Sequence, residues 1–353
     1  MNREKHDRFV EHALSDLKGG MVLLMTHIGD RLGLFRAIAD RPVTSEELAQ
    51  STHLEERYLR EWLAAMTCGG YLEYDARKQT FSLPPEYSPV LVDENSPVFF
   101  GGLYHEMPAL WSILPPLMEK FRNGGGLSIN EYSREWWDGM ERFTATWFEN
   151  FLLQQWVPQA NGMKSRLEQG AHVTDIGCGR GRALIKLAQA FPHMTATGYD
   201  LSETNLEGAR RNAREAGVDD RVRFACHDVH DGLPEEYDIA MTFDAVHDLK
   251  NPQAAFKAIH DALAEDGVYL VLEFRVGDQL EDNIGPIGAM FYAWSVTYCM
   301  TTSLGMHGAG LGTCGMPESF LREMATNAGF SEVSVVPFDN PFNKVYLAKK
   351  RAA

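Results

Sequence analysis

The strongest local pattern in this chain is His172-Val173-Thr174-Asp175-Ile176-Gly177-Cys178-Gly179-Arg180-Gly181. Its first half has the apolar and β-branched residues of a buried strand. Glycines then stand at three alternate positions, which lets the backbone turn sharply into a helix. The dinucleotide-binding pattern G-x-G-x-x-G would need a glycine at position 182, where Arg182 stands. The segment therefore predicts a strand, a tight turn and a helix, and the turn lacks the dinucleotide fingerprint.

Strands and helices alternate from this segment to the end of the chain. We expect strands over 172–176, 196–199, 222–225, 239–243 and 268–274. Helices are expected over 182–190, 203–216, 252–263 and 317–328, and the last one precedes two runs typical of a hairpin, 332–337 and 344–349. Strands joined by helices form parallel sheets with right-handed crossovers. The pattern therefore predicts an α/β fold with a doubly wound, Rossmann-like sheet.

The residues before this region predict a separate helical domain. Apolar residues at three-to-four-residue steps over 7–39 indicate an amphipathic helix with a break at Gly19-Gly20. Thr44 and Glu47 can form a capping box that opens a short helix, and a second helix is expected over 55–68. Two short strands are expected next, over 71–74 and 80–83. Two helices followed by a β-wing are typical of a winged-helix domain.

Winged helices often bind DNA, so the charge of this domain decides how it is interpreted. The chain has 33 Lys and Arg against 49 Asp and Glu, a formal net charge of -16. The helix over 55–68 contains three glutamates and two arginines, which leaves no positive face for phosphates. We therefore expect no nucleic acid partner and interpret the domain as the dimerisation domain of a homodimer. A winged-helix regulator with a cofactor-sensing sheet domain is the alternative from a different class.

We expect three parts along the chain: a winged-helix dimerisation domain over 1–90, a helical linker and substrate-pocket region over 91–165, and the sheet domain over 166–353. The middle part contains five of the seven tryptophans. Five apolar residues in it recur at helical spacing: Trp136, Met140, Phe143, Trp147 and Phe151. We interpret this stripe as core packing, part of which can also form one wall of a substrate pocket.

The composition favours a cytoplasmic protein that does not enter the membrane. The five cysteines form no C-x-x-C pair, so neither a disulfide framework nor a thiolate zinc site is indicated. Residues 283–317 contain no Asp, Glu, Lys or Arg, but six glycines between 285 and 312 dilute their apolar residues below the level of a spanning helix. We expect this charge-free segment to cover a bound substrate.

The strand followed by D-x-G-x-G-x-G resembles the first motif of the class I S-adenosylmethionine-dependent methyltransferases. The resemblance implies S-adenosylmethionine as the cofactor. It also implies that Asp175 accepts a hydrogen bond from the ammonium group of that cofactor, and that Gly177, Gly179 and Gly181 let the backbone turn beneath its methionine portion.

Later strand ends supply the other expected cofactor contacts. Asp200 ends the second strand, where doubly wound folds place an acid that accepts from the ribose hydroxyls. Asp228 and Val229 match the positions that meet the adenine ring in this family. Leu201 and Phe243, each at the end of a strand, complete the expected cofactor site.

The fourth strand leads into Phe243-Asp244-Ala245-Val246-His247-Asp248. Over roughly residues 10–350 the chain resembles the winged-helix small-molecule O-methyltransferases, including a bacterial group described only as S-adenosylmethionine-dependent methyltransferases. In that family a His-Asp pair follows the fourth strand, so the resemblance implies His247 as the general base and Asp248 as its catalytic partner. The family's tryptophan after the pair is Leu249 here, and Lys250-Asn251-Pro252 replaces an acidic pair. The sequence therefore predicts O-methylation of a small molecule without identifying it.

A metal-assisted reaction is the chemical alternative. A carbon nucleophile such as an enolised 2-oxo acid would favour a metal ion that holds both substrate oxygens. Some relatives of this layout resemble iron-containing C-methyltransferases, and by that resemblance His247 and His307 would be metal ligands. In the O-methylation interpretation no metal is expected.

Overall fold

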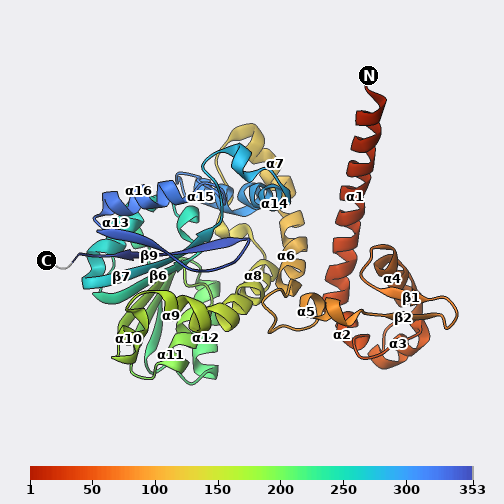
Figure 1. The fold of residues 1–353 in the computed structure, drawn as a ribbon, viewed down its shortest axis with the longest axis horizontal. Helices are drawn as coiled ribbons and strands as arrows, with labels where there is room; N and C mark the ends of the chain where they lie inside the picture. The colour runs from red at the N-terminus through yellow and green to blue at the C-terminus, as the bar shows by residue number, and fades with distance from the viewer. Residues whose placement is uncertain (352–353) are drawn as a thin grey trace. The chain divides into compact units, whose positions relative to one another are not determined.

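The computed structural model describes residues 1–351, which form two compact units (Figure 1). The N-terminal unit comprises Met1–Trp111 and Arg134–Trp147. The sheet unit comprises Ser112–Ser133 and the chain from Phe148 onward. The domain boundaries expected from the sequence, after residues 90 and 165, stay predictions.

The N-terminal unit consists of helices and one hairpin. Its first part contains α1 (Arg3–Arg31), α2 (Leu34–Ala37), α3 (Ser45–Thr52), α4 (Glu56–Cys68), β1 (Glu73–Asp75) and β2 (Thr80–Ser82). Then follow η1 (Pro85–Tyr87), α5 (Ser88–Leu91), α6 (Gly101–Ser112) and α8 (Arg134–Trp147). The expected capping box of Thr44 and Glu47 is present. Leu48 of α3 lies in the core of this unit together with Trp62 and Met66 of α4, so the apolar side of α4 is buried.

Helix α1 corrects one expectation. It is continuous from Arg3 to Arg31, so the predicted break at Gly19-Gly20 is wrong. A glycine inside a helix costs about 1 kcal/mol relative to alanine, which does not by itself end a helix with well-placed neighbours on both sides.

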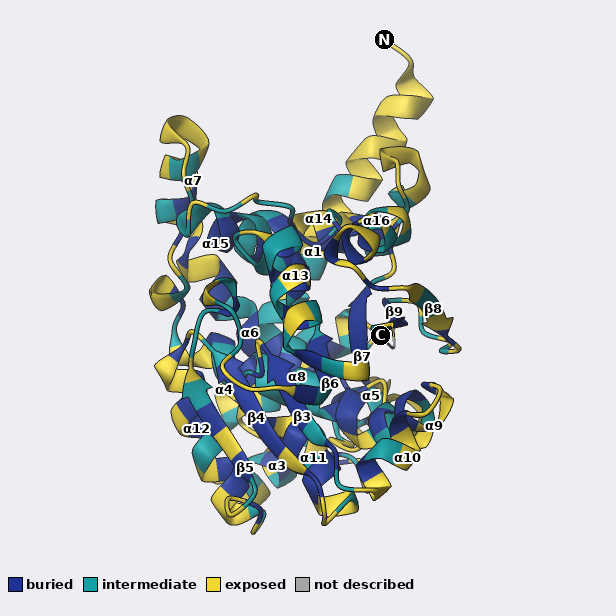
Figure 2. Ribbon diagram, turned by 90° about the vertical axis from the view of Figure 1, so that its left-hand side faces the viewer, coloured by how far each residue is buried: buried dark blue, intermediate teal, exposed yellow. Residues whose placement is uncertain are grey.

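The sheet unit contains seven strands in the order β5-β4-β3-β6-β7-β9-β8. They are β3 (His172–Ile176), β4 (Thr195–Asp200), β5 (Val222–Cys226), β6 (Tyr237–Phe243), β7 (Leu263–Phe274), β8 (Glu332–Val336) and β9 (Asn343–Lys349). The first five pair in parallel, and β9 pairs antiparallel with both β7 and β8. The predicted doubly wound sheet with a terminal hairpin is confirmed. Figure 2 shows β3, β4 and β7 buried along most of their length.

Helices connect and cover these strands. The crossover helices are α11 (Arg182–Ala190), α12 (Glu203–Glu215) and α13 (Pro252–Ala262), and α16 (Glu318–Ala328) precedes the hairpin. Before β3 lie α7 (Leu114–Asn123), η2 (Ile129–Glu131), η3 (Phe148–Trp156), α9 (Val157–Gln159) and α10 (Met163–Glu168). Short turns η4 (Val229–Asp231) and η5 (Val246–Asp248) follow β5 and β6. The chain runs outward from β3 to β5 and then returns to the other side of β3, so the strand order reverses between β3 and β6. Ligands of such sheets bind at the carboxyl ends of the strands at this reversal.

The charge-free segment is helical over most of its length. After η6 (Leu280–Asn283) come α14 (Pro286–Trp294), the π-helix η7 (Ser295–Cys299) and α15 (Met300–Gly305). The amides of Leu127 and Ala309 donate to the carbonyls of Thr301 and Lys250, at 3.0 and 2.9 Å. Its role as a substrate cover stays a prediction. Within residues 1–351, no helix is both long enough and apolar enough to cross a membrane.

Candidate active site

The glycine turn after β3 packs against the turn after β6. Gly177 has φ +73°, and a Cβ on it would lie 2.8 Å from the Cβ of Ala245, so this position excludes a side chain. The amide of Gly177 donates to the Tyr199 carbonyl at 2.8 Å, and the amide of Gly179 donates to Asp200 Oδ2 at 2.9 Å. The turn is therefore tied to the end of β4.

Asp175 has the environment of a ligand-binding acid. Asp175 is 2% exposed, and its Oδ1 has no hydrogen-bond partner among the described residues. Burial, with a smaller contribution from the Asp200 charge, raises the pKa of this carboxyl well above its usual range. A buried acceptor without a donor costs free energy that a ligand N–H can recover. This orphaned oxygen beside the glycine turn fits an ammonium-bearing cofactor such as S-adenosylmethionine.

The carboxylate of Asp200 already accepts backbone amides on both oxygens. Oδ2 accepts from Gly179 and Oδ1 accepts from Ser202, at 2.9 and 2.7 Å. Leu201, the next residue, is 40% exposed, whereas Val229 is buried. The Phe243 ring packs against Phe148 and Trp156, with centroid distances of 5.1 and 5.7 Å.

Asp228 is held by two basic side chains. Its Oδ2 accepts from Lys250 Nζ and its Oδ1 lies against His230 Nδ1, both at 2.5 Å. Burial disfavours the charged form of Asp228, but these contacts outweigh it and lower the pKa to about 2. Lys250 departs from the pattern of the resembled family. It forms its ion pair with Asp228, an expected adenine-binding residue, and not with a member of the His-Asp pair.

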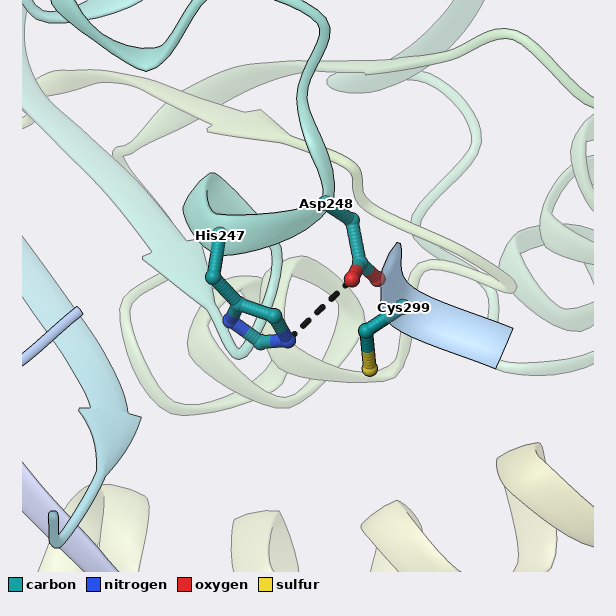
Figure 3. Close-up of side chains that lie close together, drawn as sticks. All are labelled: His247, Asp248 and Cys299. Atoms are coloured by element: carbon teal, nitrogen blue, oxygen red, sulfur yellow. Dashed lines mark ion pairs between the residues drawn. The ribbon is translucent and has the colours of Figure 1, made fainter. Parts of the chain in front are cut away.

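His247 lies in η5 and is buried, with 1% exposure (Figure 3). Its Nδ1 is 2.6 Å from Glu273 Oε2, and Glu273 Oε1 accepts from the amide of Val246 at 3.1 Å. Its Nε2 is 3.2 Å from Asp248 Oδ1. Glu273 is fully buried near the end of β7, next to β6 in the sheet. Sequence reasoning missed Glu273, although an acid near the end of the apolar run Val268–Phe274 was a usable signal.

The two carboxylates set the proton affinity of His247. Burial disfavours the imidazolium, but the charges of Glu273 and Asp248 outweigh burial and raise the pKa of His247 well above its usual value. Neutral His247 is therefore a stronger proton acceptor than a free histidine.

Asp244 shapes the turn that carries His247. It has φ +47°, an uncommon conformation for a residue with a side chain. Its amide donates to the Leu272 carbonyl at 2.9 Å, and Asn343 Nδ2 lies 2.9 and 2.8 Å from its two carboxylate oxygens. Contacts to β7 and β9 thus fix the conformation of the turn.

Cys299 is the second residue that sequence reasoning missed. It comes from η7, and its Sγ accepts from Thr313 Oγ1 at 3.0 Å. One potential ligand atom each from His247, Asp248 and Cys299 lies within 4.8 Å of the others (Figure 3). Burial raises the pKa of the Cys299 thiol to about 12. His307, the metal ligand considered from the sequence, is exposed and lies outside this three-residue group.

Comparison with known families decides the class of the sheet unit. The family described as "Methyltransferase domain" matches residues 167–316, and the "Rv2258c-like winged HTH domain" matches residues 20–92. The chain carries a methyltransferase domain. It also carries an N-terminal winged helix-turn-helix domain. The methyltransferase domain and the winged-helix domain that the sequence predicts are both confirmed.

Individual relatives differ in how much they cover. The polyketide synthase ThaQ of Burkholderia thailandensis is 33% identical over 31% of this chain, and the match spans 5% of ThaQ. The mitomycin biosynthesis 6-O-methyltransferase of Streptomyces lavendulae is 24% identical over 76% of this chain and 79% of its own length. The N,N-dimethyltransferase OxyT of Streptomyces rimosus is 27% identical over 70% of this chain and 73% of its own length.

Solved structures share the fold of the whole chain. An O-methyltransferase family protein from Burkholderia thailandensis superposes with a TM-score of 0.72 at 17% identity, covering 98% of both chains. Human N-acetylserotonin methyltransferase in complex with SAM has a TM-score of 0.70 at 16% identity and covers 97% of this chain and 98% of its own. Both superpositions show that this chain shares the fold of these methyltransferases.

We expect Asp200→Ala to weaken S-adenosylmethionine binding about five- to a hundredfold, the equivalent of about 1–3 kcal/mol. The substitution removes the acceptor expected for the ribose hydroxyls and also releases the amide of Gly179. Calorimetric titration measures the change, with Asp219→Ala, at an exposed position, as the control. An unchanged affinity would contradict the assignment of Asp200 to the cofactor site.

Proposed function

We propose that this chain transfers the methyl group of S-adenosylmethionine to an oxygen atom of a small molecule, with His247 and Asp248 as the catalytic pair. The observation that carries the proposal is the buried His247, whose Nδ1 is 2.6 Å from Glu273. It follows β6, where the strand order of the sheet reverses. The contact of Ala245 with the Gly177 position links its turn to the glycine turn. These contacts support His247 as a proton acceptor next to the proposed cofactor site.

The proposed cofactor residues divide by the part of the cofactor they would meet. Asp175 and the glycine turn would receive the methionine portion, and Asp200 with Leu201 would receive the ribose. Asp228 and Val229 would receive the adenine, with Lys250 keeping Asp228 ionised. Phe243 would lie near the reacting methyl group. The full proposed set is Asp175, Gly177, Gly179, Gly181, Asp200, Leu201, Asp228, Val229 and Phe243.

Methyl transfer to a hydroxyl group requires a methyl donor and a group that accepts the hydroxyl proton. S-adenosylmethionine, when bound, supplies a methyl group that passes to the acceptor oxygen while its sulfur keeps the electron pair of the broken bond. A phenol with a pKa of about 10 must lose its proton to react well, and a free imidazole has a pKa of about 6.5. Glu273 and Asp248 narrow this gap because they raise the pKa of His247. The hydroxyl proton then goes to His247 Nε2, while Glu273 holds Nδ1.

The acceptor element is proposed from the relatives. The mitomycin relative is named as an O-methyltransferase, and it matches most of this chain. OxyT, named for N,N-dimethylation, favours nitrogen as the second candidate. The test is incubation with methyl-labelled S-adenosylmethionine and a panel of phenols and aromatic amines. If no phenol receives the label but an aromatic amine does, the acceptor atom is nitrogen and the proposal of oxygen is wrong.

We further propose a homodimer formed through the N-terminal unit. Val10, Leu14, Leu17 and Met21 are spaced four, three and four residues apart on α1 and are all exposed. This spacing puts them on one side of the helix, as in helices that pair along an apolar seam. The negative charge of the chain supports protein rather than nucleic acid as the partner. The five cysteines are all unpaired, which supports the predicted cytoplasmic location.

Leu17→Glu should convert the dimer to a monomer, because it places a charge within the proposed apolar seam of α1. Sedimentation at micromolar concentration measures the mass, with Asp16→Asn as the neighbouring control. A wild-type protein that sediments as a 39.6 kDa monomer would refute the dimer.

A further inference from the structure

We propose that His247, Asp248 and Cys299 bind one zinc ion, whose open position takes the acceptor oxygen. This inference rests on the proposed transfer of methyl to an oxygen atom, and it replaces one step of that function: the zinc ion, in place of His247 as general base, ionises the acceptor. Metal-binding cysteines usually occur in C-x-x-C pairs, which can be recognised in a sequence, and this sequence contains no such pair. The fold instead brings one cysteine of η7 to the His-Asp pair of η5 (Figure 3).

The distances among the three donors suit a zinc ion. His247 Nε2 is 3.2 Å from Asp248 Oδ1, and one ligand atom from each of the three residues lies within 4.8 Å of the others. Zinc bonds of about 2.0 Å to nitrogen and oxygen and about 2.3 Å to sulfur place tetrahedral donors about 3.3–3.8 Å apart. Small side-chain rotations are therefore enough to close the site around an ion.

The donor set favours zinc over calcium and magnesium. Imidazole and thiolate are ligands of zinc, whereas calcium and magnesium prefer oxygen donors. Three protein ligands are the number found in catalytic zinc sites, where the fourth position is left for water or substrate. The same count here leaves one position for the acceptor.

Two neighbouring side chains orient the ligands. Glu273 lies 2.6 Å from Nδ1 of His247, which directs Nε2 toward Asp248 and Cys299. Metal-binding histidines commonly have their other ring nitrogen fixed by a carboxylate in this way. Thr313 donates to Sγ of Cys299 at 3.0 Å, a contact that stabilises a thiolate.

Charge also favours a cation in this place. The carboxylates of Asp248 and Glu273 both form their ion pair with His247, so two acids share one imidazole. Oδ1 of Asp248 is buried and has no hydrogen-bond partner among the described residues, although it faces Nε2. A doubly charged ion between these groups would offset two of the three negative charges of Asp248, Glu273 and the Cys299 thiolate, and it would satisfy the free oxygen of Asp248.

Zinc changes how the acceptor loses its proton, not where the methyl group goes. A hydroxyl bound to zinc ionises at a lower pH than the free hydroxyl, and its proton leaves to solvent. The zinc ion is then bound to Nε2 where a proton would otherwise be, so His247 is a metal ligand and not the proton acceptor. The acceptor oxygen attacks the methyl carbon as in the metal-free reaction.

Cobalt is the probe for this site, because a thiolate ligand gives Co²⁺ a charge-transfer absorption that histidine and carboxylate alone do not. We expect one Co²⁺ per full-length chain after chelator treatment and desalting, displaced by one Zn²⁺. Cys299→Ser should abolish the charge-transfer band, and Asp248→Asn should weaken zinc binding at least tenfold. Glu273→Gln should weaken it about 10–100-fold.

Two matched variants separate this site from binding elsewhere. Cys314→Ser changes a nearby cysteine outside the cluster, and His307→Ala changes the exposed histidine considered from the sequence. Both should keep the band and the stoichiometry, and thermal melts identify any variant that fails to fold. A band that survives in folded Cys299→Ser, or wild-type protein that binds neither ion, would overturn the proposal.

The same protein samples distinguish failure of the ion from failure of the function. Full methyl transfer by protein that contains no metal would refute the zinc ion and leave the proposed function standing. One zinc per chain, lost in the ligand variants but without methyl transfer to any acceptor in the panel, would support the site and count against the function.

Discussion

His247→Ala should lower the turnover of methyl transfer by roughly 10²–10⁴-fold. The substitution removes Nε2, the atom proposed either to accept the hydroxyl proton or to bind the ion that ionises the hydroxyl. The affinity for S-adenosylmethionine should change little, because the proposed cofactor contacts come from the ends of β3, β4, β5 and β6 and do not include His247. Steady-state turnover and calorimetric affinity, measured on the same preparation, separate the two quantities.

His307→Ala is the matched control for this experiment, because His307 is exposed and lies outside the catalytic group. It should keep normal turnover. If His247→Ala also keeps near-normal turnover on the best acceptor, the reaction is driven by proximity to the methyl group, as for an acceptor already anionic at neutral pH.

Glu273→Gln should lower turnover by roughly 10²–10⁴-fold while preserving the volume of the side chain. Glu273 is fully buried and contacts both His247 Nδ1 and the Val246 amide, so it sets the ring orientation and stabilises positive charge on His247. A neutral amide can still occupy this place but cannot balance that charge. The effect should fall on kcat, with KM for the acceptor nearly unchanged.

Glu265→Gln, at an exposed position of the same strand β7, controls for the loss of one negative charge from the chain. It should leave both constants unchanged. A normal kcat in folded Glu273→Gln would mean that Glu273 only fills space beside His247.

Local patterns were enough to predict the fold. The alternation of strands and helices after residue 171 and the capping box at Thr44 are short-range signals, and the sheet and the winged helix-turn-helix domain are both present. The predicted break at Gly19-Gly20 was wrong because the glycine penalty is small compared with the support of a long helix on both sides.

The candidate site could be predicted only in part, because its members come from distant segments. His247 and Asp248 adjoin in sequence and were found by resemblance. Glu273 reaches them because β6 and β7 pair in parallel, and Cys299 reaches them from a π-helix in the charge-free segment. Neither contact leaves a spacing pattern in the sequence, since Glu273 lies 26 positions after His247 and the whole of β7 lies between His247 and Cys299.

Calorimetric titration of the purified chain with S-adenosylmethionine tests the central claim most directly. We predict a saturating signal with one site per chain, and a marked loss of affinity in Gly177→Val, whose side chain would collide with Ala245. The control Gly217→Ala changes a glycine with open space around it and should bind normally. Folded wild-type protein that binds neither S-adenosylmethionine nor S-adenosylhomocysteine at millimolar concentration would contradict the account.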